Sequence, residues 1–310
     1  MADPRTSRNR TGHWQERITG LFLKFAASGW ISPRLFEPDL PPPELRAARR
    51  GRLTLEIVSH CWQYAQLLIY QLSSLVRYPP QQLDVIMTVY YNEEDVDTHK
   101  LLKRFAALSV NGVQWNWCAI PQSSLFRRAI GRNHTALHST ADWIWFTDCD
   151  LMFAEGCLDT LAERLQGSRD ALCFPQVEHV TSLLPAEHPM LNPDIDSTLP
   201  LCPDLTAFAE YRRTRATGPL QITHGDVARA CGYCNALPYY QKPASTWRKA
   251  HEDRAFRWLL QTQGTPLAVP GVYRIRHASK GRYTGHPILT WIRGGLRRLV
   301  STWQERLASP

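Results

Sequence analysis

Two acidic residues, Asp148 and Asp150, stand one position apart after a largely apolar run, residues 141–147. A short apolar run followed by polar residues is typical of a buried strand, so both carboxylates are expected where that strand ends. Like charges at such a place repel each other, and a bound Mg²⁺ or Mn²⁺ that also holds the phosphates of a nucleotide removes the repulsion. The pair indicates a divalent-metal site; a turn with two solvated acids is the alternative.

A second acidic pair, Glu252 and Asp253, comes about a hundred residues later, with Trp247 just before it and His277 after it. A carboxylate is already ionised at neutral pH and needs only correct placement to act as a general base. Each residue also has a simpler explanation. Acids favour the first turn of a helix because of the helix dipole, and a single histidine is commonly a surface or core residue.

Alternating strands and helices are expected to position these groups. Strands are predicted at residues 53–59, 83–89, 113–120, 141–147 and 171–177, and helices at 64–76, 96–108, 124–139 and 156–165. Strands joined by single helices imply right-handed crossovers and a largely parallel sheet with helices on both faces. Ligands of such sheets bind beyond the carboxyl ends of the strands, where His60, residues 90–95 and the Asp148/Asp150 pair fall.

The remaining segments are less regular. Trp14, Ile18, Leu21, Phe22 and Phe25 form an apolar stripe at helical spacing, and a proline-rich linker follows it. Residues 178–220 are predicted to form a long irregular excursion. A helix is expected at 247–261, entered through Thr246, followed by an extended segment at 266–277 and a basic amphipathic tail at 288–310.

Composition limits the class of protein. The chain has 310 residues, 44% of them hydrophobic, and a net charge of +8. That charge belongs to the ends, because residues 1–52 carry +5, residues 271–310 carry +7 and the part between them carries −4. No run approaches the roughly 18 apolar residues of a spanning helix, and residues 1–20 do not resemble a signal peptide, so a cytoplasmic protein is expected. The eight scattered cysteines suit reduced thiols.

Several motifs follow one another in a meaningful order. Gly131, Arg132 and Asn133 precede the Asp148/Asp150 pair, and the later acidic pair and His277 follow it. With this order, residues 53–282 resemble a family 2 glycosyltransferase of the GT-A fold. The resemblance implies an α/β fold, doubly wound around a mostly parallel sheet with helices on both faces. It also implies transfer of a sugar from a nucleoside-diphosphate donor to an acceptor hydroxyl, dependent on Mn²⁺ or Mg²⁺, with inversion at the anomeric carbon.

On the donor side, the resemblance assigns roles to residues near the first acidic pair. Asp150 would coordinate a cation bridging the two phosphates of the donor, and Asp148 would face the ribose or join in holding the metal. Arg132 and Asn133 would lie near the nucleotide or support the metal-binding loop. His60, at the end of the first strand, would contact the donor.

On the acceptor side, the resemblance makes Asp253 the general base and Glu252 the residue that orients the acceptor. Trp247 would stack on an acceptor ring. His277 would be a further metal or diphosphate contact. Lys280 and Arg282 would neutralise phosphate charge.

The chain departs from the family where the base of the nucleotide is usually bound. The first two strands end here in residues 59–62 and 89–94, which do not match the usual motifs. Glu93 and Asp95 both remain candidates for the acid that the family places there. A UDP-linked donor is therefore expected only as the commonest case.

The apolar and charge patterns at the ends, together with the resemblance in between, divide the chain into parts with different expected tasks. These are an N-terminal amphipathic helix and linker at 1–52, a nucleotide-sugar-binding half at 53–177, an acceptor-binding and catalytic-base half at 178–287, and a basic amphipathic C-terminal helix at 288–310. The acceptor would be a saccharide or a lipid-linked molecule. The basic ends either pack on the body or bind an anionic membrane surface, which would place the protein on the inner face of the membrane.

Two other classes of protein compete with this interpretation. A phosphatase or phosphotransferase would use the first Asp of such a pair as its nucleophile, but three strand–helix units precede Asp148 here. A degenerate transferase domain tethered to a membrane would need no catalytic residues, yet the candidate positions are all occupied. No motif supports a nucleic-acid partner.

Overall fold

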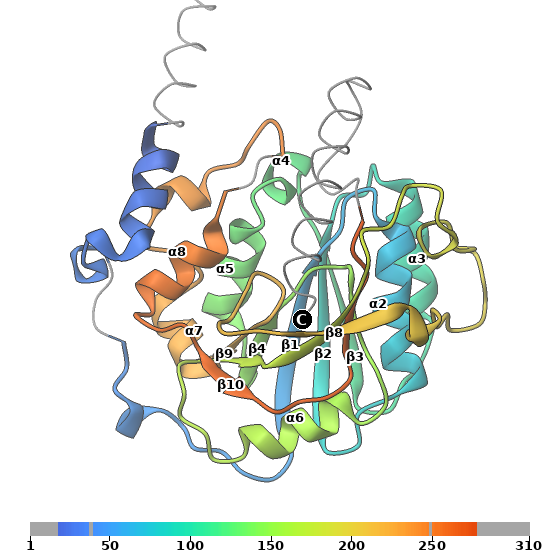
Figure 1. Ribbon diagram of the computed structural model, residues 1–310, viewed down its shortest axis with the longest axis horizontal. Coiled ribbons are helices and arrows are strands. Elements are labelled where there is room, and N and C mark those ends of the chain that lie inside the picture. The colour runs from blue at the N-terminus through green and yellow to red at the C-terminus, as the bar shows by residue number, and fades with distance from the viewer. Residues whose placement is uncertain (1–17, 37–39, 248–249, 278–310) are drawn as a thin grey trace, which may run out of the picture.

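A seven-stranded sheet forms the centre of the molecule in a computed structural model that describes residues 18–36, 40–247 and 250–277 (Figure 1). The strand order is β10-β6-β9-β4-β1-β2-β3. The bounds are β1 Leu53–His60, β2 Leu83–Tyr91, β3 Val113–Ala119, β4 Trp143–Phe146, β6 Leu172–Pro175, β9 Gln221–His224 and β10 Thr265–Leu267. All neighbouring pairs are parallel except those that β9 makes with β4 and β6. The expected mostly parallel sheet is confirmed, with β9 as an antiparallel insertion.

Helices cover both faces of this sheet. The bounds are α2 Ala65–Arg77, α3 Val96–Ala106, α4 Gln122–Leu125, α5 Ala129–His138, α6 Cys157–Leu165, α7 Gly225–Cys231 and α8 Glu252–Leu259. Ser59 of β1 donates to Gln71 of α2, whereas the next residue, His60, packs against Gly131 of α5. Because neighbouring residues of a strand point to opposite faces, α2 and α5 lie on opposite sides of the sheet, as in a doubly wound α/β fold.

A second sheet, of four strands, lies beside α2. Its first strand, β5, follows β4 in the chain. Its order is β5-β11-β7-β8, with β5 Leu151–Phe153, β7 Val177–Thr181, β8 Phe208–Arg212 and β11 Val272–Arg274. Strand β11 pairs antiparallel with β5, so that Tyr273 lies opposite Met152. The closing segment of the chain therefore returns to the residues that directly follow Asp150.

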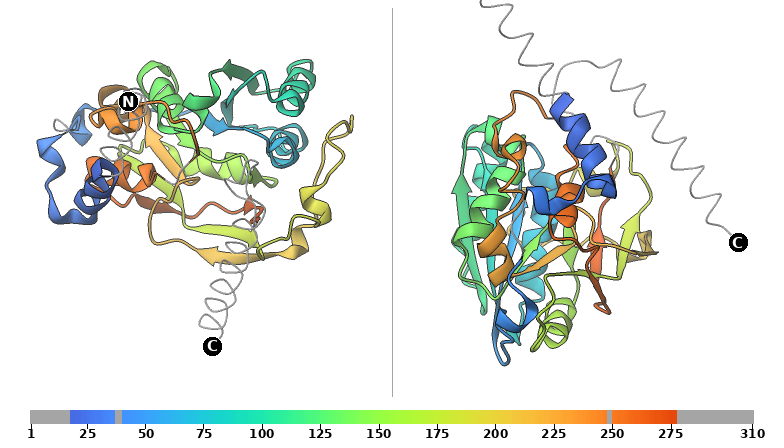
Figure 2. Two further views of the ribbon diagram at one scale, coloured as in Figure 1. Left: turned by 90° about the horizontal axis from the view of Figure 1, so that it is seen from above. Right: turned by 90° about the vertical axis from the view of Figure 1, so that its left-hand side faces the viewer.

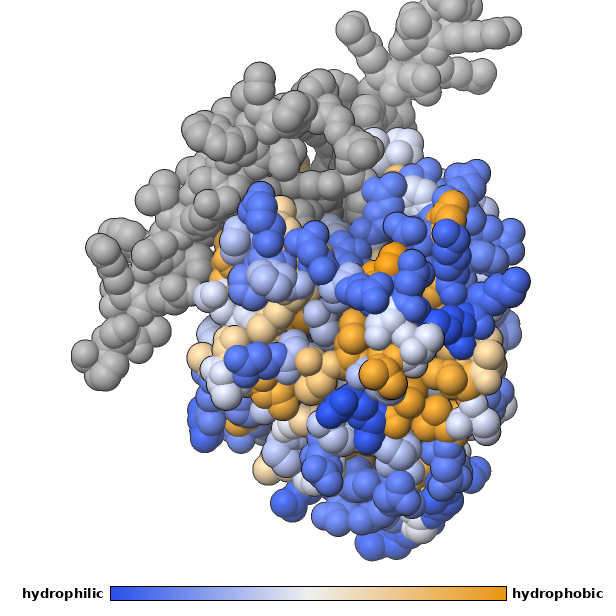
Figure 3. All heavy atoms as spheres, turned by 90° about the vertical axis from the view of Figure 1, so that its right-hand side faces the viewer, coloured by the Kyte–Doolittle hydropathy of each residue, from blue (hydrophilic) through white to orange (hydrophobic). Residues whose placement is uncertain are grey.

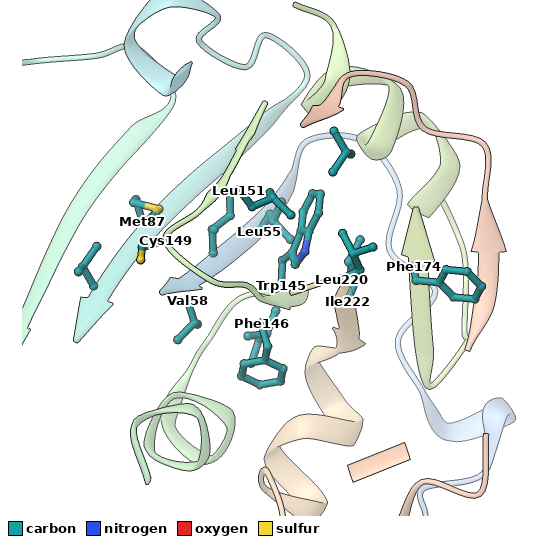
Figure 4. Close-up of a cluster of buried hydrophobic side chains, with 14 of the residues drawn as sticks. Leu55, Val58, Met87, Trp145, Phe146, Cys149, Leu151, Phe174, Leu220 and Ile222 are labelled. Atoms are coloured by element: carbon teal, nitrogen blue, oxygen red, sulfur yellow. The ribbon is translucent and has the colours of Figure 1, made fainter. Parts of the chain in front are cut away.

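The core fills the space between these layers (Figure 4). Trp145 of β4 is fully buried, and its indole nitrogen donates to the carbonyl of Pro219 over 2.9 Å. Cys149 also points into this cluster (Figure 4). The loop that carries the first acidic pair is thus anchored in the core by the residue between the two acids.

The structure corrects several predicted boundaries. The helix expected at 124–139 is two helices, α4 and α5, interrupted at residues 126–128. The strand expected at 171–177 divides into β6 and β7, and the predicted irregular excursion contains β7 and β8. The helix expected from Trp247 begins only at Glu252, because His251 has a φ of 57° in the left-handed region and interrupts the helical path. Thr246 is therefore not its entry point.

The N-terminal segment lies beside α8, at the end of the molecule away from α3 (Figures 1 and 2). Residues 18–25 are helical and lead into the short helices η1 Ala26–Trp30 and η2 Pro33–Leu35, with η3 Pro43–Leu45 further on. Trp14 and the predicted tail at 288–310 lie outside the described residues. The division into a donor half and an acceptor half stays a prediction.

Figure 3 shows the other end of the molecule, where apolar side chains gather near the middle of the face and hydrophilic ones border them. Within the described part of the chain, no helix has both the length and the apolar character needed to cross a bilayer.

Candidate active site

The loop between β4 and β5 carries Asp148 and Asp150. Asp148 accepts hydrogen bonds from Arg128 and, at 3.4 Å, from Arg132. The backbone of the loop is held as well, because Arg132 donates to the Thr147 carbonyl over 3.0 Å and Gln71 donates to the Asp148 carbonyl over 3.2 Å. Since Arg132 lies on α5 and Gln71 on α2, both faces of the sheet fix this loop.

Asp150 lies on the side of the loop that faces the second sheet. It is 5% exposed, and its carbonyl accepts a hydrogen bond from the Ile275 amide over 2.9 Å. Burial lowers the pKa of the nearby Arg274, but the negative charges of Glu178, Asp150 and Asp148 outweigh this effect and raise it. Arg274 itself is bonded to Glu178 at 3.0 Å. Cations thus flank the acidic loop on two sides.

Arg128 connects the two acidic pairs. Its guanidinium donates to Asp148 and also, over 3.1 Å, to Glu252. Burial would lower the pKa of Arg128, but the charges of Asp148 and Glu252 raise it above its ordinary value, so the side chain stays charged. Sequence reasoning missed this residue. The available signal was its position one helical turn before Arg132, which puts both side chains on one face.

The second acidic pair opens helix α8, where the positive end of the helix dipole favours acidic residues. Glu252 is 3% exposed and is bound to Arg128. The side chain of Asp253 is 33% exposed and lies 3.5 Å from Arg257, one turn further along the helix. The structure therefore brings both predicted acidic pairs together, with the more exposed carboxylate at Asp253.

Arg132 and Asn133 have supporting contacts. Arg132 is fully buried, donates to the hydroxyl of Tyr233 over 2.9 Å, and lies over the Tyr233 ring. Asn133 accepts from the Tyr233 amide at 2.8 Å and donates to the Asn235 side chain over 3.0 Å. Of the two roles expected for this pair, support of the acidic loop fits Arg132, whereas Asn133 fixes the chain that follows α7.

His60 ends β1 close to both arginines. Its ring stacks on Tyr90 with 5.0 Å between centroids, and a Cβ at Gly131 would approach its Nε2 to 2.3 Å. Burial, with the charges of Arg132 and Arg128, holds the pKa of His60 well below its ordinary value, so the ring is neutral. Among the described residues, neither ring nitrogen has a hydrogen-bond partner. Because both nitrogens are buried, contact of His60 with the donor stays a prediction.

The sequence model described as Glycosyl transferase family 2 matches residues 72–228, which is about half of the chain. The chain belongs to glycosyl transferase family 2. A search of curated proteins finds no match.

Two solved structures resemble this family 2 chain more distantly. Residues 1–349 of TarS from Staphylococcus aureus, in complex with UDP, give 11% identity and a TM-score of 0.44 over 72% of this chain and 60% of that one. The mannosyltransferase PcManGT from Pyrobaculum calidifontis, in complex with GDP-Man and Mn²⁺, gives 15% identity and a TM-score of 0.40 over 95% and 76%. The matched part spans about three fifths of the TarS chain. Both likenesses are too distant to assign residue roles.

Two acids at the end of β2 were left open by the sequence. Asp95 is buried, caps α3 by accepting from the Thr98 amide, and accepts from the Gln63 amide at 2.5 Å. Glu93 is exposed. The carboxylate of Asp95 is therefore occupied by the loop after β1, which leaves Glu93 as the donor-contact candidate of this family 2 chain.

The other predicted site residues are placed only in part. His277 is 5% exposed, pairs through its backbone with Leu184 and packs edge-on against Tyr64 at 5.1 Å. Trp247 is half-buried in irregular chain. Lys280 and Arg282 lie outside the described residues. Contacts of these four residues with a donor, a metal or an acceptor stay predictions.

The acidic loop offers two carboxylates, Asp148 and Asp150, to a divalent cation. Within the ranges that the structure describes, no cluster of three His, Cys, Asp or Glu side chains could by itself hold a metal ion. Mg²⁺ is usually bound by one or two carboxylates together with substrate phosphates and water. Asp148 and Asp150, on one anchored loop, fit that kind of site. Because two arginines already bind Asp148, Asp150 is the stronger candidate ligand.

Proposed function

We propose that this family 2 glycosyltransferase moves a sugar from a nucleoside-diphosphate donor to an acceptor hydroxyl, with inversion at the anomeric carbon. The contact of Arg128 with both Asp148 and Glu252 carries this proposal. It puts the acids expected to face the donor next to those expected to face the acceptor. Family membership favours this reaction over the phosphatase alternative.

The donor is proposed to bind over the acidic loop. Asp150 and Asp148 would hold Mn²⁺ or Mg²⁺ against the diphosphate, and the cation would supply charge stabilisation to the leaving group. Arg128 adds a fixed positive charge at the same place, where preorganised charge is most effective. His60 and Glu93 would contact the nucleoside part. Uridine is the expected base.

The acceptor is proposed to bind at the start of α8. Asp253 takes the proton of the acceptor hydroxyl while its oxygen forms a bond to the anomeric carbon. The bond from that carbon to the diphosphate breaks, and its electron pair leaves with the phosphate oxygen. Glu252 is 3% exposed and bonded to Arg128, so it would orient the acceptor. Trp247 would stack on a ring of a saccharide or lipid-linked acceptor.

A panel of nucleotide sugars tests this proposal. Binding to the full chain is measured by calorimetry with Mn²⁺, with Mg²⁺ and with chelator, and slow donor hydrolysis is followed in parallel. At least one donor should bind and be hydrolysed in a metal-dependent way. Failure of every UDP- and GDP-linked sugar to bind would defeat the proposal. Location in the cytoplasm or on the inner face of the membrane stays a prediction.

A further inference from the structure

Large apolar side chains gather on the outside of the N-terminal segment. Of the eleven that are well exposed in the described part of the chain, six lie within residues 18–36. We call them the apolar ridge: Ile18 at 61% exposure, Leu21 at 67%, Phe22 at 45%, Phe25 at 54%, Trp30 at 77% and Leu35 at 76%. Single exposed apolar residues are ordinary, but a contiguous group marks an interaction site.

The opposite side of the same segment is already packed. Leu23 and Ala26 are buried, and a Cβ at Gly20 would come within 2.8 Å of the Tyr239 hydroxyl. Gly20, Leu23 and Ala26 therefore face the body of the protein, whereas six large apolar residues of the segment face outward. A helix that only covers a protein body has the reverse pattern, with its largest apolar residues inside and polar residues outside. Packing alone does not explain the ridge.

Hydrogen bonds fix the segment to α8 and so fix the direction in which the ridge points. Arg254 donates to the Ala27 carbonyl over 3.1 Å and to the Ser28 hydroxyl over 2.7 Å. The indole nitrogen of Trp258 donates to the Ile31 carbonyl over 2.9 Å. Figure 2 shows this segment seated against the rest of the fold. The part of the segment between Phe25 and Leu35 is thus attached to α8.

Charge on the segment selects the kind of partner. Residues 18–36 contain no Asp or Glu, and their two charged residues are Lys24 and Arg34, both exposed. The rings of Phe25 and Trp30 stack in parallel with 6.1 Å between centroids. Aromatic and aliphatic side chains next to basic ones are typical of helices that lie in the headgroup region of an anionic bilayer. Basic residues add electrostatic attraction there.

We propose that the apolar ridge docks onto an anionic lipid bilayer. Phe22, Phe25 and Trp30 enter the boundary between headgroups and acyl chains, and Lys24 and Arg34 contact lipid phosphates. The docking does not depend on the proposed function. If that function also holds, the bilayer lies on the side of the molecule near α8, the helix that carries Asp253. Arg254, the next residue of this helix, holds the N-terminal segment in place.

Vesicle flotation of the full chain tests the docking. Vesicles of phosphatidylcholine alone are compared with vesicles that also contain phosphatidylglycerol, without donor or acceptor. The wild type should float with the anionic vesicles. A Phe22→Ser/Phe25→Ser variant should bind them at least about tenfold more weakly, since burying one such side chain changes a binding constant by about this factor. Lys24→Glu should weaken binding to the anionic vesicles and leave binding to the phosphatidylcholine vesicles unchanged.

Leu199→Ser is the matched control, because Leu199 is 73% exposed and lies outside the ridge. It should bind as the wild type does, and circular dichroism should show that all variants are folded. No binding of the wild type, or equal binding of the double variant, would overturn the proposal. A wild-type dimer in light scattering that the double variant dissolves would show a second copy as the occupant and would also overturn it. Vesicle binding without transfer from any donor would defeat the proposed function and leave the docking intact.

Discussion

Replacing Arg128 by alanine tests whether the cation between the two acidic pairs matters for the reaction. Its side chain is 28% exposed, whereas those of Asp148 and Glu252 are 10% and 5% exposed. Removing one partner of a buried charge pair costs about 3–5 kcal/mol. Because water screens the exposed part of Arg128, we expect a smaller loss of unfolding free energy, about 1–3 kcal/mol.

We expect Arg128→Ala to lower kcat by more than its loss of unfolding free energy would explain. Removing one preorganised donor from a site of developing charge lowers kcat about 10²–10³-fold. Thermal unfolding measures the loss of stability, and each kcal/mol lost should lower Tm by roughly 2–4 °C in a domain of this size. Transfer or donor hydrolysis gives kcat and KM separately, at a temperature where the variant is folded.

Three controls separate charge at this position from general damage. Arg212→Ala removes an arginine that is 70% exposed and paired with Glu210, and should leave kcat unchanged. Arg128→Lys keeps the charge without the two-sided contact and should fall between wild type and Arg128→Ala. Added guanidinium should restore part of the activity of Arg128→Ala. A folded Arg128→Ala protein with kcat within about threefold of wild type would refute the electrostatic role, given the loss expected above.

The remaining predictions concern the two acidic pairs and His60. Asp253→Asn should keep nucleotide binding and lose transfer by about 10²–10⁴-fold, the usual contribution of a general base; transfer at the wild-type rate would remove Asp253 from that role. Asp150→Ala should lose the metal-dependent part of nucleotide binding in calorimetry, and binding that still responds to chelator would speak against it as a ligand. The pKa of His60 is depressed in the folded protein, so below the ordinary value of 6.5 the unfolded chain binds a proton that the folded one does not. Stability is therefore lost as pH falls through that value. His60→Phe, which keeps an aromatic ring, should lose less stability than wild type between neutral pH and about pH 5 in thermal unfolding. The same dependence of stability on pH in both proteins would refute the depressed pKa of His60.

The sequence predicted the central strands and their helices well where a long apolar pattern is present. Strands β1 and β2 and helix α3 begin at or near their expected residues because each buries a regular face. Strand β9 was not predicted, because Gln221–His224 is short and its partner β4 lies far away in the sequence. Such pairing leaves little local signal.

The site was predicted in part. Asp148 and Asp150 could be found because acidic residues directly after an apolar run are unusual, and Glu252 and Asp253 because the order of the motifs resembles that of the family. Arg128 was missed although its spacing of four residues from Arg132 was available, because its contact with Glu252 joins residues more than a hundred positions apart and leaves no local pattern. The ridge also needed the structure. A stripe of apolar residues does not say which side faces the body, and here Gly20, Leu23 and Ala26 take that side.

The position of Cys149 has a consequence for how the site recognises its ligand. Its side chain is buried in the core between Asp148 and Asp150, so the scaffold sets the spacing of the two carboxylates before any ligand arrives. Little conformational entropy should then be lost when a donor binds. The affinity would accordingly depend mainly on the charges of the ligand. A nucleoside diphosphate without its sugar should therefore retain most of the affinity of the complete donor.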